Sequence, residues 1–156
     1  MNSQGTEDLN ALLKSELAAI EIYKKALSKF QNKNGVAALQ RCQQSHNERA
    51  SKLRAAISNL DGKPIDDTGG GGQLAKLIMS RAQNMGDSAI ILALQADEEQ
   101  WSADYEWRLV SMHGDHRNLV KDDLLPAQQM TDEKVREMAS AVTKGLYPAM
   151  PGTKDV

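Results

Sequence analysis

Apolar residues recur at intervals of three and four positions along most of this chain, and this spacing places them on one face of an α-helix. The pattern predicts helices at about residues 6–33, 36–60, 73–85, 88–112 and 116–144. No segment shows the alternation of apolar and polar positions that is typical of a β-strand. The sequence therefore predicts an all-α fold.

Turn-forming residues separate the predicted helices. Asn34-Gly35 is expected to end the first helix, and the short turn there makes the first two helices antiparallel neighbours. Residues 61–72 contain a proline and four consecutive glycines, which cannot continue a helix. Pro126 is expected to kink or break the last helix locally.

These turns divide the chain into two helical hairpins. Residues 1–144 are expected to form one four-helix bundle domain, with a long crossover between the hairpins that contains the short extra helix at 73–85. Residues 145–156 hold two prolines and are expected to be an extended or disordered tail.

The two predicted hairpins are similar to each other in sequence. A shift of 82 positions aligns Glu16 with Glu98 and Tyr23 with Tyr105 on the first helix of each hairpin. A shift of 85 positions aligns the second helix with the last one. The near-equal offsets predict that one hairpin is an internal duplicate of the other.

Each of the four long helices also places polar residues on its otherwise apolar face. Glu16 and Tyr23 lie seven positions apart, almost two helical turns, so both project from the same face, and Glu98 and Tyr105 repeat this pair. A buried carboxylate is costly unless it is paired, hydrogen-bonded or bound to a metal. The other polar positions on these faces are Gln43, His46, Gln128 and Thr131.

At these residues the chain resembles the ferritin-like superfamily, whose helices supply one glutamate, then Glu-x-x-His, then one glutamate, then Glu-x-x-His to a two-metal site. Glu16 and Glu98 match the single glutamates. Tyr23 and Tyr105 match the place where ferritin-like helices often carry a tyrosine near the metals. The resemblance implies a ferritin-like four-helix bundle.

The paired ligand positions depart from that pattern. The second helix has Gln43-x-x-His46, and the last helix has Gln128-x-x-Thr131, where the superfamily has Glu-x-x-His. These are degenerate ligand positions, because a neutral amide oxygen binds metals weakly and a hydroxyl is poorer still. The departures concern the activity that the resemblance implies more than the fold.

The crossover also resembles that of a smaller bacterial ferritin-like family catalogued as a domain of unknown function. The similar features are Gly62, Pro64, the glycine stretch, the short helix, and Gly86-Asp87 before Ile90-Ile91-Leu92. The resemblance covers the chain from about residue 6 to residue 142.

Charge separates three interpretations of the buried polar groups. Two divalent metals bring four positive charges, but only Glu16, Glu98 and His46 are strong ligands, so a two-metal ferroxidase centre is not expected. In a second interpretation, the amides, the hydroxyls and His46 satisfy both carboxylates in a hydrogen-bonded network. In a third, Glu16, Glu98 and His46 hold a single iron, manganese or zinc ion, with Tyr23 and Tyr105 just outside its ligands.

Other polar and aromatic residues are weaker candidates. Glu48 and Glu133 are turned away from the inner faces and are expected to be solvated. His113 and His116 flank a turn and are also expected to be solvated. Trp107 lies off the apolar stripe and is a candidate contact between subunits.

Composition and charge exclude several classes of function. The 156 residues carry a formal net charge of −2 with both signs well mixed, so no nucleic-acid-binding stripe is predicted. No run approaches the roughly 18 apolar residues that would span a membrane. The single cysteine, Cys42, cannot form an internal disulfide and no signal-peptide pattern is present, so a cytoplasmic location is expected.

Two functional hypotheses follow from these residues. The first is a noncatalytic ferritin-like protein, lacking ferroxidase activity, that acts through its surface as a stress-associated or interaction module and forms a homodimer. The alternative is a metal-storage protein or a metal-binding oxidoreductase, with a mononuclear or atypical dinuclear iron or manganese site, in which Tyr23 or Tyr105 works beside the metal. The degenerate ligand positions favour the first hypothesis.

Overall fold

The computed structural model describes residues 3–66 and 71–145, with side chains described at residues 4–66 and 86–145. Its elements are α1 (Ser3–Lys29), α2 (Lys33–Asn59), α3 (Gly71–Leu109), α4 (Gly114–Leu119), the π-helix η1 (Val120–Leu124) and α5 (Leu125–Thr143). These described ranges contain no strand. The predicted all-α helical bundle is confirmed.

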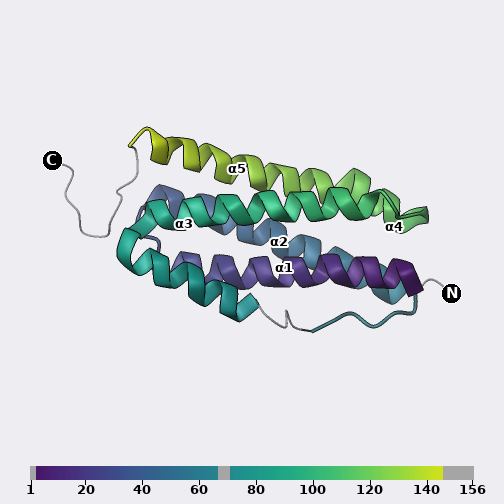
Figure 1. Ribbon diagram of the computed structural model, residues 1–156. Coiled ribbons are helices and arrows are strands. Elements are labelled where there is room, and N and C mark those ends of the chain that lie inside the picture. The colour runs from purple at the N-terminus through teal and green to yellow at the C-terminus, as the bar shows by residue number, and fades with distance from the viewer. Residues whose placement is uncertain (1–2, 67–70, 146–156) are drawn as a thin grey trace.

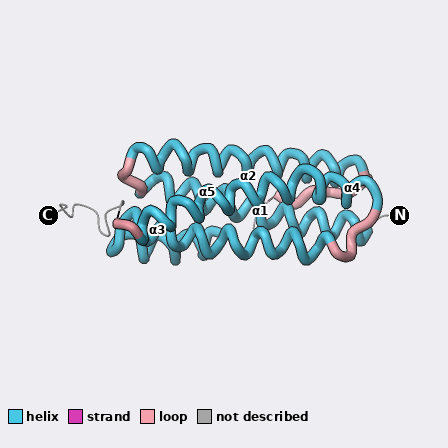
Figure 2. Tube along the Cα trace, turned by 90° about the horizontal axis from the view of Figure 1, so that it is seen from above, coloured by secondary structure: helices cyan, strands magenta, loops and turns pink. Residues whose placement is uncertain are grey.

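The long helices form two hairpins that pack side by side. Figure 1 shows α1 and α2 as one antiparallel pair, and the second part of α3 with α5 as the other. The connection after α2 runs back along α1, so α2 and the second part of α3 point in the same direction. Figure 2 shows that the long helices run along one common direction.

One asparagine ties the start of this crossover to α1. The side-chain amide of Asn10 donates to the Lys63 carbonyl oxygen at 3.0 Å, and its own oxygen accepts from the backbone N–H of Ile65 at 3.0 Å. The two bonds satisfy backbone groups that have no helical partner. The crossover is therefore held against α1 where it begins.

The turn between α1 and α2 lies earlier in the chain than the sequence pattern indicates. Asn32 caps α2, because its side-chain oxygen accepts from the backbone N–H groups of Asn34 at 3.0 Å and Gly35 at 3.1 Å. Asn34-Gly35 thus begins the second helix and does not end the first. A Cβ atom on Gly35 would overlap the ring of Phe30, so this glycine allows the ring to close the turn.

A glycine breaks α3 where the two predicted helices at 73–85 and 88–112 were separated. Gly86 has φ of 71° and ψ of −153°, a backbone conformation that is essentially restricted to glycine. Figure 1 shows the chain reversing its direction at the left end of α3. The second part of α3 enters the bundle from this break.

Asp87 fixes the second hairpin to the turn of the first. Its carboxylate is buried and accepts from the backbone N–H groups of Gln31 and Asn32, each at 2.9 Å. Bonds to a charged acceptor are stronger than bonds between neutral groups. One side chain therefore aligns the start of the second part of α3 with the α1–α2 turn.

Replacing Asp87 with alanine is expected to lower the free energy of unfolding by about 1–2 kcal/mol, because two N–H groups in a part-buried turn lose their acceptor. Urea unfolding measures this difference. Asp66→Ala removes an exposed aspartate from the crossover and is the matched control. Equal stability of the two variants would contradict the role assigned to Asp87.

The fourth helix is interrupted before its proline. The chain is helical from Gly114, and Val120–Leu124 forms a π-helix in which the Leu125 N–H donates to the Val120 carbonyl oxygen. Pro126 has no N–H and its ring would clash with the carbonyl four residues earlier in a regular α-helix. The wider π turn accommodates the proline in the first turn of α5, where we expected a kink.

Apolar side chains fill the bundle in two clusters, one toward each end. The first contains residues from the C-terminal half of α1, the start of α2 and the end of α5, and also Cys42 and Trp101. The second contains Leu9, Leu12 and Leu13 with residues from the second half of α2 and from η1. No helix in the described ranges combines the length and apolar content needed to cross a membrane.

Candidate functional site

A layer of polar side chains separates the two apolar clusters near the middle of the bundle. Each of these side chains is almost completely buried, although four of the residue types are ionisable. We call this set the polar layer: Glu16 and Tyr23 from α1, His46 and Arg49 from α2, Glu98 and Tyr105 from α3, and Gln128 and Thr131 from α5.

His46 joins the two carboxylates. Its Nδ1 lies 2.7 Å from Glu16 Oε2, and its Nε2 lies 2.9 Å from Glu98 Oε2. A carboxylate can only accept, so each ring nitrogen must carry a hydrogen to make both bonds. The imidazole is therefore a cation held between two anions.

Each tyrosine hydroxyl donates to the glutamate of the other hairpin. Tyr23 of α1 donates to Glu98 Oε2 of α3 at 2.6 Å, and Tyr105 of α3 donates to Glu16 Oε1 of α1 at 2.7 Å. The two Glu–Tyr pairs that the sequence repeats are thus crossed in space. Each hairpin supplies the donor for the other hairpin's carboxylate.

Glu98 receives further donors from α5. The Gln128 amide donates to Glu98 Oε1 at 2.8 Å and to the Glu98 carbonyl oxygen at 3.1 Å, and the Thr131 hydroxyl lies 2.9 Å from Oε1. Reversing the amide would bring its oxygen against both acceptors, so this orientation is set by the surroundings. The two degenerate ligand positions on α5 therefore act as neutral donors to Glu98.

Arg49 is the main residue of the polar layer that sequence reasoning missed. Its side chain is buried, its Nε lies 3.2 Å from Glu16 Oε1, and its Nη2 lies 3.4 Å from Thr131 Oγ1. Nη2 also lies 2.7 Å from Nδ1 of His46, a contact that is not a hydrogen bond when that nitrogen donates to Glu16. Arg49 follows His46 by one helical turn, a signal masked by its neighbour Ala50, which fits the apolar stripe.

The electrostatics of the polar layer favour an ionised Glu98 beside a charged imidazole. Burial lowers the pKa of His46, but the charges of Glu16 and Glu98 and their hydrogen bonds raise it by more, to above its usual 6.5. Burial raises the pKa of Glu98, but the charge of His46 and the bonds from His46, Tyr23 and Thr131 bring it below its usual 4.5. Burial and the adjacent glutamates raise the pKa of both tyrosines well above 10, so the hydroxyls stay protonated.

Gln43 lies outside this network, contrary to the expected role as a donor to the carboxylates. Its side chain is only half-buried, and its amide donates to the Ile20 carbonyl oxygen at 3.3 Å. Its repeat partner Gln128 points inward, so the two hairpins differ here. On α2, Arg49 and His46 contact Glu16 instead.

The polar layer fits a metal centre poorly. Both ring nitrogens of His46 bond to carboxylates, and the Gln128 amide oxygen, its only metal-binding atom, points away from Glu98. Arg49 brings a fixed positive charge to Glu16. No group of three or more His, Cys, Asp or Glu residues in the described side chains is arranged to hold a metal ion.

Asp97 is a second ionisable group that sequence reasoning missed. Burial and the adjacent charge of Glu98 raise its pKa from 3.8 to about 6. Its Oδ2 atom is buried and has no hydrogen-bond partner among the described residues. Asp97 is thus a partly buried carboxyl beside, but not within, the polar layer.

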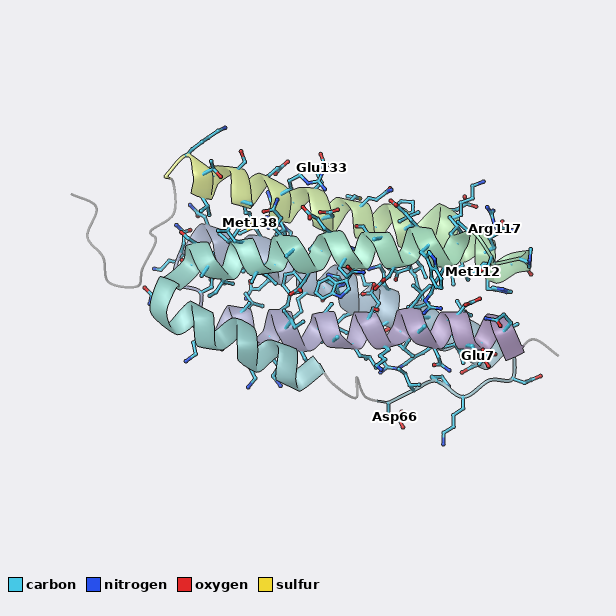
Figure 3. The ribbon with its side chains drawn as sticks, in the orientation of Figure 1. Glu7, Asp66, Met112, Arg117, Glu133 and Met138 are labelled. Atoms are coloured by element: carbon cyan, nitrogen blue, oxygen red, sulfur yellow. The ribbon has the colours of Figure 1, made fainter. Side chains whose placement is uncertain are left out.

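The weaker candidates lie away from the polar layer. Glu48 and Glu133 are exposed, and Figure 3 shows Glu133 on the outer side of α5. His113 is exposed and His116 is half-buried, and both line a hollow of about 470 Å³ at the end of the bundle. Trp107 is exposed on α3.

Cys42 is a core residue. It is buried in the apolar cluster at the start of α2. Burial, followed by the charge of Glu98, raises the pKa of its thiol to about 11. The thiol is therefore protonated at neutral pH and is a poor nucleophile.

Comparison with known proteins places the chain in a family without assigning an activity. No curated protein matches it, and no solved structure matches it. Residues 4–109 match a family described as a domain of unknown function, DUF2383. This range covers α1, α2 and α3, including Glu16, His46, Arg49 and Glu98, and most of the chain. The chain belongs to the DUF2383 family.

Proposed function

We propose that this chain is a ferritin-like bundle that functions without a metal centre, as a protein-interaction module. The ferritin-like assignment is supported by two hairpins joined by one long crossover. It is further supported by glutamates at matching places on α1 and α3, with polar pairs three residues apart on α2 and α5. All of these positions except Gln43 face inward, as the ligand positions of the superfamily do.

The balance of charge in the polar layer carries the proposal. Glu16 and Glu98 contribute two negative charges, and Arg49 and His46 contribute two positive charges. A buried carboxylate needs a compensating charge and donors, and both carboxylates have them. The protein thus supplies from its own side chains the charge that metal ions supply in a ferritin-like centre.

A metal ion would have to displace groups that are already bonded. Coordination by His46 requires a neutral imidazole and breaks at least one of its bonds to Glu16 and Glu98. The ion would also lie close to the guanidinium of Arg49, which repels it. The competing interpretation, a single ion held by Glu16, Glu98 and His46, therefore requires a rearrangement of the polar layer.

The burial of the polar layer favours a structural role over a catalytic one. The acidic and phenolic groups are nearly inaccessible to solvent. A surface groove of about 440 Å³ between α2 and α5 is lined by Cys42 and Thr131, but Glu16 and Glu98 are not among its lining residues. The groove therefore touches the polar layer only at Thr131. We therefore place the function on the outer surface of the bundle.

Metal analysis of the purified protein tests the proposal. Protein produced in cells grown with added iron and manganese should contain well under one metal ion per chain, measured by inductively coupled plasma mass spectrometry. Added Fe²⁺, Mn²⁺ or Zn²⁺ should leave the thermal midpoint unchanged, because a ligand that binds the native state would raise it.

The Glu16→Ala and Glu48→Ala variants make the outcome specific. Glu48 is exposed on α2 and lies away from the polar layer. Stoichiometric metal that is lost in Glu16→Ala and retained in Glu48→Ala would overturn the proposal and support the metal-binding alternative.

A further inference from the structure

Two buried atoms of the polar layer have no hydrogen-bond partner among the described residues. They are Nη1 of Arg49 and Oε1 of Gln128, and each side chain belongs to a residue that is at most 1% exposed. Leaving such atoms without partners is costly, so native proteins satisfy nearly all of them with protein groups or with bound water. One atom is a donor and the other is an acceptor, and a water molecule can serve both.

Contacts that are already made hold both groups in their orientations. The Gln128 amide nitrogen donates to Glu98 Oε1 at 2.8 Å, and turning the amide over would bring two acceptors together. The Arg49 guanidinium directs Nε to Glu16 at 3.2 Å and Nη2 to Thr131 at 3.4 Å. Rotating either group in search of a protein partner would break these contacts.

The groove between α2 and α5 reaches this part of the polar layer. Its volume is about 440 Å³, and its lining includes Ser45 of α2 and Thr131 of α5. Thr131 contacts Arg49 and lies three residues after Gln128, so both unpartnered atoms belong to neighbours of this inner wall. A water molecule takes up only about 30 Å³ of the liquid, so the groove has room for it. The hydroxyls of Ser45 and Thr131 are additional polar partners.

Charge favours water over an ion at this place. The polar layer already balances two positive charges with two negative ones. A cation would be repelled by the guanidinium of Arg49, and an anion would upset the balance in a buried region. The charged lining residues of the groove have both signs, since Arg41 and Lys134 are accompanied by Glu48. A neutral molecule that both donates and accepts fits these surroundings.

We propose that the inner end of the groove between α2 and α5 is a hydration site, in which ordered water accepts from Arg49 Nη1 and donates to Gln128 Oε1. The water completes the hydrogen bonding of two buried side chains and is held by the bundle as part of its interior. This inference goes beyond the proposed function, because it assigns a bound ligand to the polar layer and does not depend on the metal content.

A high-resolution crystal structure of the wild-type chain tests the site directly. Density for water should lie within hydrogen-bonding distance of Arg49 Nη1 and of Gln128 Oε1. Direct bonds from both atoms to protein groups, a space without water, or an ion in that space would each overturn the proposal.

Solvent exchange of the Arg49 guanidinium hydrogens, measured by nuclear magnetic resonance, tests entry through the groove. Ser45→Leu places a larger apolar side chain in the groove and should slow this exchange about tenfold relative to the wild-type chain, because water no longer reaches the guanidinium without an opening of the bundle. Ser51→Leu, at an exposed position on the same helix, is the matched control and should leave the rate unchanged. Equal rates in Ser45→Leu and the wild-type chain would refute a hydration site supplied by the groove.

Discussion

Replacing Arg49 with methionine should lower the free energy of unfolding by about 3–5 kcal/mol, the loss expected when one partner of a buried ion pair is removed. Methionine replaces the aliphatic part of the arginine side chain but is shorter, so the change removes the buried guanidinium together with its charge. Glu16 would then keep Tyr105 and His46 as donors but lose its closest fixed cation. His46 alone cannot balance two carboxylates.

A double variant separates this loss of charge from a loss of packing. Urea unfolding should show that Arg49→Met combined with Glu16→Gln is more stable than Arg49→Met alone, because removing both charges removes the uncompensated one. Arg54→Met, at an exposed position on the same helix, should change the stability by less than about 0.5 kcal/mol. Equal losses in Arg49→Met and in the double variant would assign the effect to packing.

The contribution of the polar layer to stability should depend on pH on both sides of the range from 4.5 to 6.5. The folded pKa of His46 lies above 6.5, so its contribution is fully present below 6.5 and is lost as the pH rises through the folded pKa. The folded pKa of Glu98 lies below 4.5, so its contribution is present above 4.5 and is lost as the pH falls through the folded pKa. Each group changes the free energy of unfolding by at most about 1.4 kcal/mol per pH unit.

Urea unfolding between pH 6 and pH 8.5 measures the alkaline part of this dependence. Cys42 contributes little below pH 8, because its thiol mostly keeps its proton there in both the folded and the unfolded chain. The wild-type chain should become less stable as the pH rises, and His46→Gln should show a flatter profile. An identical slope in His46→Gln would show that another group causes the loss.

Asp97 should act in the opposite sense from Glu98. Its folded pKa of about 6 exceeds the usual 3.8, so its contribution to stability is lost as the pH rises between these values. Asp97→Asn removes this group and therefore serves as a second control in the acidic range. With Asp97 removed, the rise in stability with increasing pH that Glu98 causes should be easier to detect.

The sequence predicts the fold class well because apolar periodicity records which face of each helix is buried. Glu16 and Glu98 could also be singled out, since a carboxylate within an apolar stripe is a conspicuous exception. The structure brings both together with His46, Tyr23 and Tyr105. Spacing along one helix was enough to identify these inward-facing groups.

Partner choice in the polar layer could not be read from spacing. Arg49 is a long cation that would ordinarily extend into solvent, and only the arrangement of all four helices shows that it turns inward to Glu16. Gln43 has the same spacing from its histidine as Gln128 has from Thr131, yet it bonds to the Ile20 carbonyl. Small rotations of a helix decide between such positions, and periodicity does not resolve them.

The predicted helix boundaries at Asn34-Gly35 and near Pro126 differ from the observed ones for a related reason. Asn34-Gly35 is a typical helix stop, but the cap formed by Asn32 and the ring of Phe30 make it a helix start. The π-helix before Pro126 depends on how the chain absorbs a missing N–H, which several local conformations can do. In both cases contacts that complete the turn select one conformation among those that the sequence permits.

The tyrosine–glutamate hydrogen bonds between the hairpins make the stability of each hairpin depend on the other. Separation of the hairpins would leave Glu16 without the hydroxyl of Tyr105 and Glu98 without that of Tyr23. Partial opening of the bundle therefore costs these two charge-assisted bonds and the bond between His46 and Glu98, in addition to the apolar contacts. This reciprocal requirement favours unfolding of the two halves in a single cooperative transition.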